Sequence, residues 1–155
     1  MVTLKGIPSI ISPDLLYVLA KMGHGDEIVL ADGNFPTSSV CRSGPTEVRA
    51  DGMGIPELLQ AILKLFPLDT YIIHPAAVMD LVDQDKEKGL KTPVWEKYLE
   101  LLSDVGCEKP LEKVERFAFY ARAKEAFAVV ATGETALYGN LILKKGVIPA
   151  GEKDK

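Results

Sequence analysis

The sequence predicts an α/β domain in which helices pack on a largely buried sheet. Stretches with apolar residues at helical spacing alternate with short apolar runs that are typical of buried strands. This alternation favours helices that cover one sheet. The 155 residues have about the length of one domain. We therefore expect a single domain over residues 1–150, followed by a disordered tail over residues 151–155.

The first helix is predicted to begin at Ser12 and to end at Gly23. Serine is a favoured N-cap, and the proline and aspartate that follow it suit the first helical turn. The apolar run Ile28–Ala31 is typical of a buried strand, with Asp32 at its C-terminal end. Residues 33–46 are rich in Gly, Pro, Ser and Thr, and we expect a loop there.

The middle of the chain continues the alternation. A strand is expected at 47–50, followed by a helix with Pro56 near its start that Pro67 stops. The apolar run Tyr71–Ile73 is typical of another buried strand. Residues 80–91 are strongly charged, and we expect them to be solvated.

The last third of the chain predicts two more helices and two more strands. A helix is expected from Thr92 to Gly106, and an extended stretch after Pro110 leads to a second helix. The predicted ranges are 117–126 for that helix, and 127–131 and 141–143 for the strands.

Composition and charge argue against several classes of protein. The net charge is −4 and no Lys/Arg cluster forms a basic face, so no nucleic-acid partner is expected. The two cysteines, Cys41 and Cys107, show no C-x-x-C spacing, so we expect neither a structural zinc site nor a disulfide framework. We expect both to be reduced thiols, as in a cytosolic protein. No window approaches 18 consecutive apolar residues, and the first residues lack the pattern of a signal peptide. We expect a soluble, cytoplasmic protein without a membrane partner.

The motifs that the sequence lacks narrow the chemistry. There is no phosphate-binding loop, and Gly52-Met53-Gly54 lacks the third glycine of a dinucleotide fingerprint. Neither a His-x-x-x-His pair nor a nucleophile elbow occurs. We therefore expect no metal site, and if the protein is an enzyme, acid–base chemistry is what its residues can offer.

His24 and Asp32 are the first candidate site residues. His24 lies between two glycines, and histidine can donate or accept a proton near neutral pH; the structural alternative is a surface histidine that pairs with helix carbonyls. Asp32 ends a predicted strand, where ligands of α/β sheets gather, although an Asx-turn with Gly33 explains it equally well. Asp69 has the same ambiguity. For His74 we favour a structural role, a hydrogen bond to the backbone.

Arg116, Tyr120, Tyr138 and Asn140 supply the polar and aromatic groups that bind sugars. Planar polar side chains reach adjacent hydroxyl groups, and aromatic rings pack against the apolar face of a sugar. Each residue alone is weak evidence, because most aromatic residues near Arg116 are expected in the core or on a helix surface.

The sequence resembles the fucose mutarotase and ribose pyranase family, and its fucose branch in particular. The similarity extends from about Ile10 to Pro149. It is carried by separated segments that occur in the family's order: Ser12–Leu16, Met22–Glu27, Val48–Gly52, Arg116–Tyr120, Tyr138–Asn140 and Lys144–Val147.

The resemblance implies a three-layer α/β/α fold (RbsD-like), no cofactor and a homo-oligomer. It implies interconversion of the anomers of a monosaccharide, L-fucose, by ring opening and reclosure, with His24 as the proton donor. The sugar-contacting positions that it implies are Asp32, Asp69, Arg116, Tyr120, Tyr138 and Asn140. Asp32 would orient His24 or hold sugar hydroxyls, and the base is left open between a tyrosine, an aspartate and water.

Three alternatives remain at this point. A ribose-type pyranase uses the same ring opening, so only a comparison of substrates separates it. A sugar-binding module would bind without turnover. A nucleotide-binding α/β protein is disfavoured by the missing phosphate loop.

Overall fold

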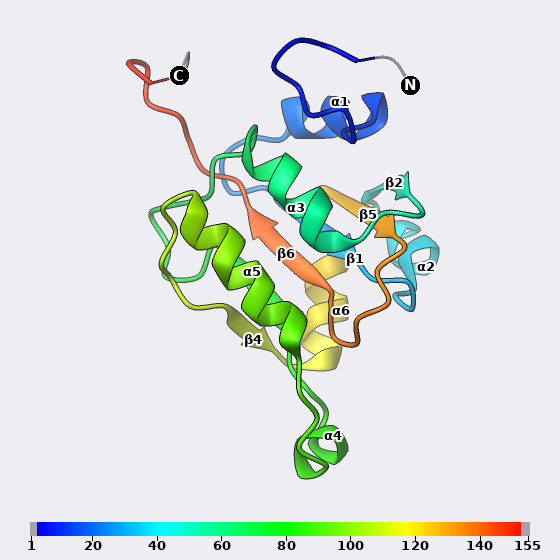
Figure 1. Cartoon of the computed structure of the whole chain (residues 1–155). Helices are drawn as coiled ribbons and strands as arrows, with labels where there is room; N and C mark the ends of the chain where they lie inside the picture. Colours follow the sequence, from blue (N-terminus) through cyan, green and yellow to red (C-terminus); the bar gives the residue numbers. More distant parts are fainter. Residues whose placement is uncertain (1–2, 153–155) are drawn as a thin grey trace.

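The computed structural model describes residues 3–152, and its centre is one six-stranded sheet flanked by helices (Figure 1). The strands are β1 (Glu27–Ala31), β2 (Thr46–Ala50), β3 (Ala76–Met79), β4 (Glu112–Val114), β5 (Ala128–Thr132) and β6 (Leu141–Lys144). The helices are α1 (Pro13–Lys21), α2 (Thr37–Cys41), α3 (Ile55–Leu63), α4 (Asp83–Glu87), α5 (Pro93–Asp104) and α6 (Arg116–Lys124). The tail expected to be disordered falls largely, at residues 153–155, outside the described residues.

The sheet is mixed, with strand order β2-β5-β1-β6-β3-β4. Only β6 runs antiparallel to its neighbours β1 and β3, while the other neighbouring pairs are parallel. Strands β1 to β5 therefore all end at one edge of the sheet, where β6 begins. We call this the carboxyl edge and the opposite edge the amino edge.

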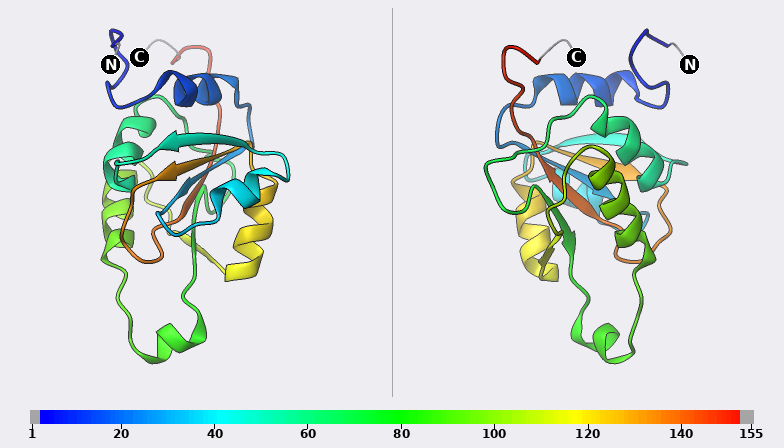
Figure 2. Two further views of the ribbon diagram at one scale, coloured as in Figure 1. Left: turned by 90° about the vertical axis from the view of Figure 1, so that its right-hand side faces the viewer. Right: turned by 60° about the vertical axis from the view of Figure 1, so that its left-hand side comes forward.

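Helices cover both faces of the sheet. On one face, α1, α3 and α5 pack on a large apolar cluster that includes Ile28, Leu30 and Leu141. On the other face, α2 and α6 pack on a smaller cluster around Val29, Ile142 and the fully buried Phe119. The left view of Figure 2 shows α3 and α5 on one side of the sheet and α2 and α6 on the other. The predicted α/β class and its three layers are confirmed.

Several elements form where the local chemistry predicts them. Ser12 caps α1, because its hydroxyl accepts a hydrogen bond from the Leu15 N–H at 3.1 Å. The central strands β1, β3 and β5 are buried along almost their whole length, as continuous apolar runs predict.

The strand predicted at Tyr71–Ile73 is wrong. These residues form a bend, and the side chains of Tyr71 and Ile73 are 76% and 74% exposed. The backbone carbonyls of Thr70 and Ile72 accept hydrogen bonds from Lys109 Nζ instead of from a neighbouring strand. The strand forms after Pro75, where four buried apolar residues form β3 and the first three of them pair with β6.

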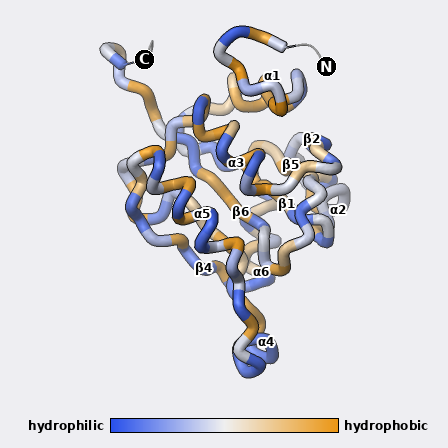
Figure 3. Tube along the Cα trace, viewed as in Figure 1, coloured by the Kyte–Doolittle hydropathy of each residue, from blue (hydrophilic) through white to orange (hydrophobic). Residues whose placement is uncertain are grey.

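Two short helices lie in segments without a predicted helix. Helix α2 lies within the loop expected at 33–46, and α4 lies within the charged segment 80–91. As predicted for that segment, α4 has no buried residue; it is hydrophilic and projects beyond the carboxyl edge (Figures 1 and 3). Within residues 3–152, no helix is long and apolar enough to cross a membrane.

Candidate functional site

A cavity of about 340 Å³ opens at the carboxyl edge of the sheet, between the ends of β1 and β3 and the start of β6. It is large enough for a small ligand. Five predicted sugar-contacting residues lie together in its wall: Asp32, Arg116, Tyr120, Tyr138 and Asn140. The remaining lining residues are Asn34, Phe35, Met79, Val82, Asp85 and Leu137.

Asp32 places a nearly buried carboxylate in this wall. Burial raises the pKa of Asp32, against the opposing effect of backbone N–H groups of Asn34, Gly139 and Phe35. One carboxylate oxygen accepts the Asn34 N–H at 3.0 Å, the Asx-turn geometry that the sequence also allows. The backbone N–H of Asp32 donates to Asn140 Oδ1 at 2.7 Å, so the end of β1 and the start of β6 are held together.

Helix α5 fixes the backbone that carries Tyr138 and Asn140. Trp95 Nε1 donates to the Tyr138 carbonyl at 2.9 Å, and the buried Tyr98 hydroxyl donates to the Gly139 carbonyl at 2.6 Å. Among residues 3–152, Tyr138 is the one non-glycine residue with a positive φ, 60°. Such a conformation costs roughly 1–2 kcal/mol and persists only where neighbours enforce it. The two hydrogen bonds from α5 supply that constraint.

The Tyr138 hydroxyl is held by α4 and the residue before it. Its oxygen accepts the Val82 N–H at 3.3 Å, and its proton is donated to the Asp85 carboxylate. Burial, followed by the hydrogen bond to Asp85, raises the pKa of Tyr138. The phenol is therefore protonated and oriented at neutral pH.

Arg116 and Tyr120 lie on the first turns of α6. Arg116 Nε donates to the Tyr120 hydroxyl at 3.4 Å, and the guanidinium lies 5.7 Å from the centre of the Tyr120 ring. Phe35 packs at 5.6 Å from the same ring. The cavity therefore offers a cation, a hydroxyl and two aromatic rings on one side.

His24 and Asp69 meet at the other edge of the sheet. His24 Nε2 lies 3.3 Å from Asp69 Oδ1; the histidine side chain is 46% exposed and the aspartate side chain 5%. Burial alone would raise the pKa of Asp69, but the Tyr71 N–H and the His24 ring favour the carboxylate, and the net shift is downward. His24 Nδ1 forms no hydrogen bond within residues 3–152 and is free to face a ligand.

The segment Lys144–Gly146 holds this pair in place. The Lys145 carbonyl accepts the Gly25 N–H at 2.8 Å, and the Lys144 carbonyl accepts the Asp69 N–H at 3.0 Å. The Lys145 ammonium group also donates to two carbonyls at the end of α1. Gly146 packs so closely that a Cβ there would lie 2.3 Å from the Leu68 carbonyl oxygen.

Within one chain, His24 is far from the cavity. His24 precedes β1 at the amino edge and Asp32 follows it at the carboxyl edge, so the strand alone separates them by about 17 Å at 3.3 Å per residue. The expectation that Asp32 orients His24 is therefore wrong for a single chain, in which Asp69 has that position. His74 Nδ1–H donates to the Pro110 carbonyl at 3.0 Å, which confirms its structural interpretation.

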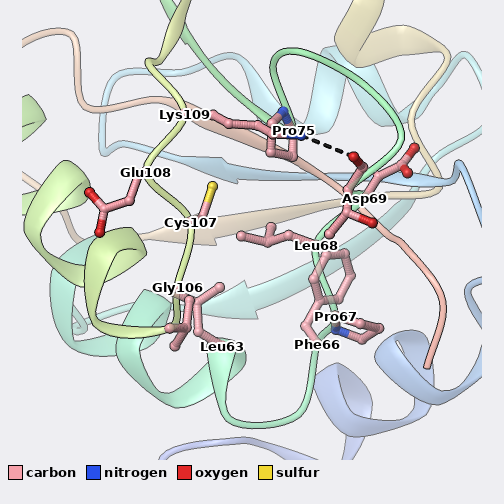
Figure 4. Close-up of a pocket in the computed structure, with 12 residues that line it drawn as sticks. Leu63, Phe66, Pro67, Leu68, Asp69, Pro75, Gly106, Cys107, Glu108 and Lys109 are labelled. Atoms are coloured by element: carbon pink, nitrogen blue, oxygen red, sulfur yellow. Dashed lines mark hydrogen bonds between the residues drawn. The ribbon is translucent and has the colours of Figure 1, made fainter. Parts of the chain in front are cut away.

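A second cavity, of about 290 Å³, lies between the end of α3 and the segment after α5 (Figure 4). Asp69 is the one predicted site residue in its wall. The dashed line in Figure 4 is the 3.0 Å bond from Lys109 to the Thr70 carbonyl, so this cation is engaged with the backbone. The walls are largely apolar, and the cavity at the carboxyl edge matches a sugar better.

Asp85 and Phe35 are site residues that the sequence analysis missed. Asp85 belongs to a charged segment that looks like a solvated surface, and only the three-dimensional structure places α4 beside Tyr138. Phe35 lies three residues after Asp32, inside the expected loop. Its closeness in sequence to a candidate site residue was the one signal that could have identified it. Within the described part of the chain, no three His, Cys, Asp or Glu side chains are grouped to hold a metal ion.

Comparison with known proteins is consistent with this geometry. Residues 5–148 match the model of the RbsD / FucU transport protein family. The chain is 71% identical to fucose mutarotase of Danio rerio (99% of each chain) and 69% identical to that of Homo sapiens (96% of each). It superposes with TM-score 0.86 and 47% identity on fucose mutarotase of Streptococcus pneumoniae in complex with L-fucose, covering 94% of this chain and all of that one. The chain belongs to the RbsD / FucU family.

Proposed function

We propose that this protein is a fucose mutarotase, an isomerase that interconverts the α and β anomers of L-fucose by acid–base ring opening and reclosure. The observation that carries the proposal is the carboxyl-edge cavity, where five polar or aromatic residues of the predicted set converge. The likeness to mutarotases along almost the whole chain, and to one whose structure holds L-fucose, supports the same conclusion.

The cavity offers a monosaccharide the contacts that it needs. Asp32 presents an oxygen acceptor at the end of β1, Asn140 presents amide N–H donors at the start of β6 because its oxygen accepts the Asp32 N–H, and Arg116 presents donors from α6. The Phe35 and Tyr120 rings supply an apolar surface for the less polar face of the sugar. Because Asp32 and Asn140 are anchored to the sheet, their positions are set before a ligand binds.

His24 is the proton donor in this proposal. When Nε2–H donates to Asp69, a protonated imidazole presents Nδ1–H to the ring oxygen of the sugar. The bond between the ring oxygen and the anomeric carbon breaks while the anomeric hydroxyl loses its proton, and the open aldehyde forms. Rotation about the bond to the anomeric carbon followed by reclosure gives the other anomer, and each proton returns.

A complete site is assembled from two copies of the chain. The amino edge carries the acid and the carboxyl edge carries the cavity, so His24 of one copy must meet the cavity of another. Exposed apolar side chains support such contacts at both edges: Tyr71 lies 5.7 Å from the His24 ring, and Leu137 is 55% exposed in the cavity wall. The protein is therefore a homo-oligomer.

The compartment that we infer is the cytoplasm, because Cys41 and Cys107 are free thiols.

Magnetisation-transfer NMR between the two anomeric protons of L-fucose tests the proposal. The native protein is expected to accelerate exchange, and His24→Ala is expected to lower that acceleration by about 10²–10⁴-fold. Binding of L-fucose without faster exchange would favour a sugar-binding module instead. Stronger acceleration with D-ribose, between pyranose and furanose forms, would favour a pyranase.

A further inference from the structure

The Tyr138 hydroxyl faces the cavity as a hydrogen-bond acceptor only. A phenol has one proton and two lone pairs. Its proton is donated to Asp85, and one lone pair accepts the Val82 N–H at 3.3 Å. One lone pair remains for a ligand, and the ligand group that it can receive is a hydroxyl acting as a donor.

We propose that Tyr138 and Asp85 together form the proton acceptor of the ring-opening step, with Tyr138 touching the sugar and Asp85 acting as its positioning residue. This inference rests on the proposed function and assigns the base that the sequence leaves open. It also gives α4 a role, because the residues that hold the phenol lie in α4 or directly before it.

The proton movements balance. The O–H bond of the anomeric hydroxyl breaks and its proton moves to Tyr138 Oη, while the phenol's own proton moves to the Asp85 carboxylate. At the other side of the sugar, His24 gives its proton to the ring oxygen as the bond to the anomeric carbon breaks. The free carbonyl forms, His24 has lost one proton and Asp85 has gained one. Reclosure on the opposite face reverses both transfers.

The geometry favours this pair over the other acceptors in the cavity. Tyr120 accepts a hydrogen bond from Arg116, and no carboxylate receives its proton within residues 3–152. Asp32 is anchored at the end of β1, with one oxygen bonded to the Asn34 N–H. Tyr138 combines an oriented lone pair with a carboxylate already bonded to its proton, so the transfer needs no rearrangement.

The rigid backbone beneath Tyr138 supports the same role. The positive φ of Tyr138 is enforced by Trp95 and by Tyr98 through the adjacent carbonyl. The positive φ brings the phenol between α4 and the cavity. A residue that only filled space would not need this conformation. Strained backbone that neighbours enforce is typical of functional sites.

Asp85→Asn tests the inference. The amide oxygen of asparagine still accepts the phenol proton, so the orientation of Tyr138 is retained, but the amide does not take up the proton. We expect the exchange rate constant at saturating L-fucose to fall about 10²-fold or more, with the affinity for L-fucose unchanged. Asp83→Asn is the matched control, since it removes the same charge from an exposed position of α4 and is expected to leave exchange unchanged.

Tyr138→Phe and the double variant complete the experiment. If the two residues act as one unit, Tyr138→Phe lowers exchange as far as Asp85→Asn does, and the double variant falls no further than Tyr138→Phe. Native-like exchange in Asp85→Asn, multiplicative losses in the double variant, or a loss that saturating sugar restores would each overturn the inference. These outcomes are distinct from failure of the proposed function, in which the native protein itself would not accelerate exchange.

Discussion

The hydrogen bond from Tyr98 to the Gly139 carbonyl gives the sharpest prediction for stability. Tyr98 is fully buried in α5, and its hydroxyl donates at 2.6 Å to the segment that carries Tyr138 and Asn140. Burial raises the pKa of Tyr98, so the hydroxyl is a donor at neutral pH. Tyr98→Phe removes this donor alone.

The expected cost follows from the geometry. Removing only the oxygen leaves the packing of the ring unchanged but leaves the Gly139 carbonyl without its partner. A buried polar group deprived of its hydrogen bond costs about 1–3 kcal/mol. For a protein of this length, each kcal/mol lowers Tm by about 2–4 °C. We also expect weaker L-fucose binding, because the backbone of Tyr138 and Asn140 loses one of its two anchors.

Urea unfolding at neutral pH measures the free energy of unfolding of Tyr98→Phe. Tyr17→Phe is the matched control: Tyr17 is 64% exposed, its hydroxyl bonds only Lys21 among residues 3–152, and the same change there is expected to stay within about 0.5 kcal/mol of native. Equal free energies of unfolding for the two variants would refute the claim that α5 anchors the site.

Three further predictions concern the two edges of the sheet. Gly146→Ala is expected to lower the free energy of unfolding by about 1–3 kcal/mol, because its Cβ would lie 2.3 Å from the Leu68 oxygen; Gly23→Ala, with its nearest contact at 3.7 Å, is the control in the same thermal melts. Lys145→Met removes two charged hydrogen bonds to the end of α1 and is expected to cost about 1.5–3 kcal/mol by urea unfolding, and a native-like value would contradict this. Asp32→Asn is expected to raise Tm at neutral pH while impairing catalysis, because burial raises the pKa of Asp32 in the folded protein and the ionised carboxylate therefore destabilises the native state above the unfolded pKa of 3.8. The gain in Tm should vanish as the pH falls below that value, and a gain independent of pH would contradict the assignment.

Much of the fold follows from local sequence signals. Ser12 marks the start of α1 by its capping hydroxyl, and the run from Ile28 to Ala31 forms a strand because the sheet buries both of its faces. Tyr71–Ile73 shows the limit of such signals. Its apolar residues resemble a strand, but Lys109, far along the chain, donates to the carbonyl of Ile72 and to that of Thr70 just before the segment, and no local pattern contains that partner.

The site could be predicted in part. The residues of the carboxyl edge were identified by the resemblance to the family, while the residue types alone, a strand-end aspartate, tyrosines and an asparagine, only suggested sugar binding. Their convergence depends on the strand order, which local periodicity does not determine. Asp85 was missed because a charge in a charged segment has no distinguishing pattern. Of the two roles left open for Asp32, orienting His24 is wrong within one chain, because β1 separates the two residues.

Complementation between inactive variants tests the central claim most directly. His24→Ala and Asp32→Ala, each checked as folded, are dissociated, mixed and reassembled, and the exchange of L-fucose anomers is measured by NMR. If each site joins His24 of one copy to the cavity of another, random assembly is expected to restore about one quarter of the native activity, because half of the sites receive an intact histidine and half of those an intact cavity. No recovery in assemblies shown to contain both variants would contradict a site built from the two edges of the sheet.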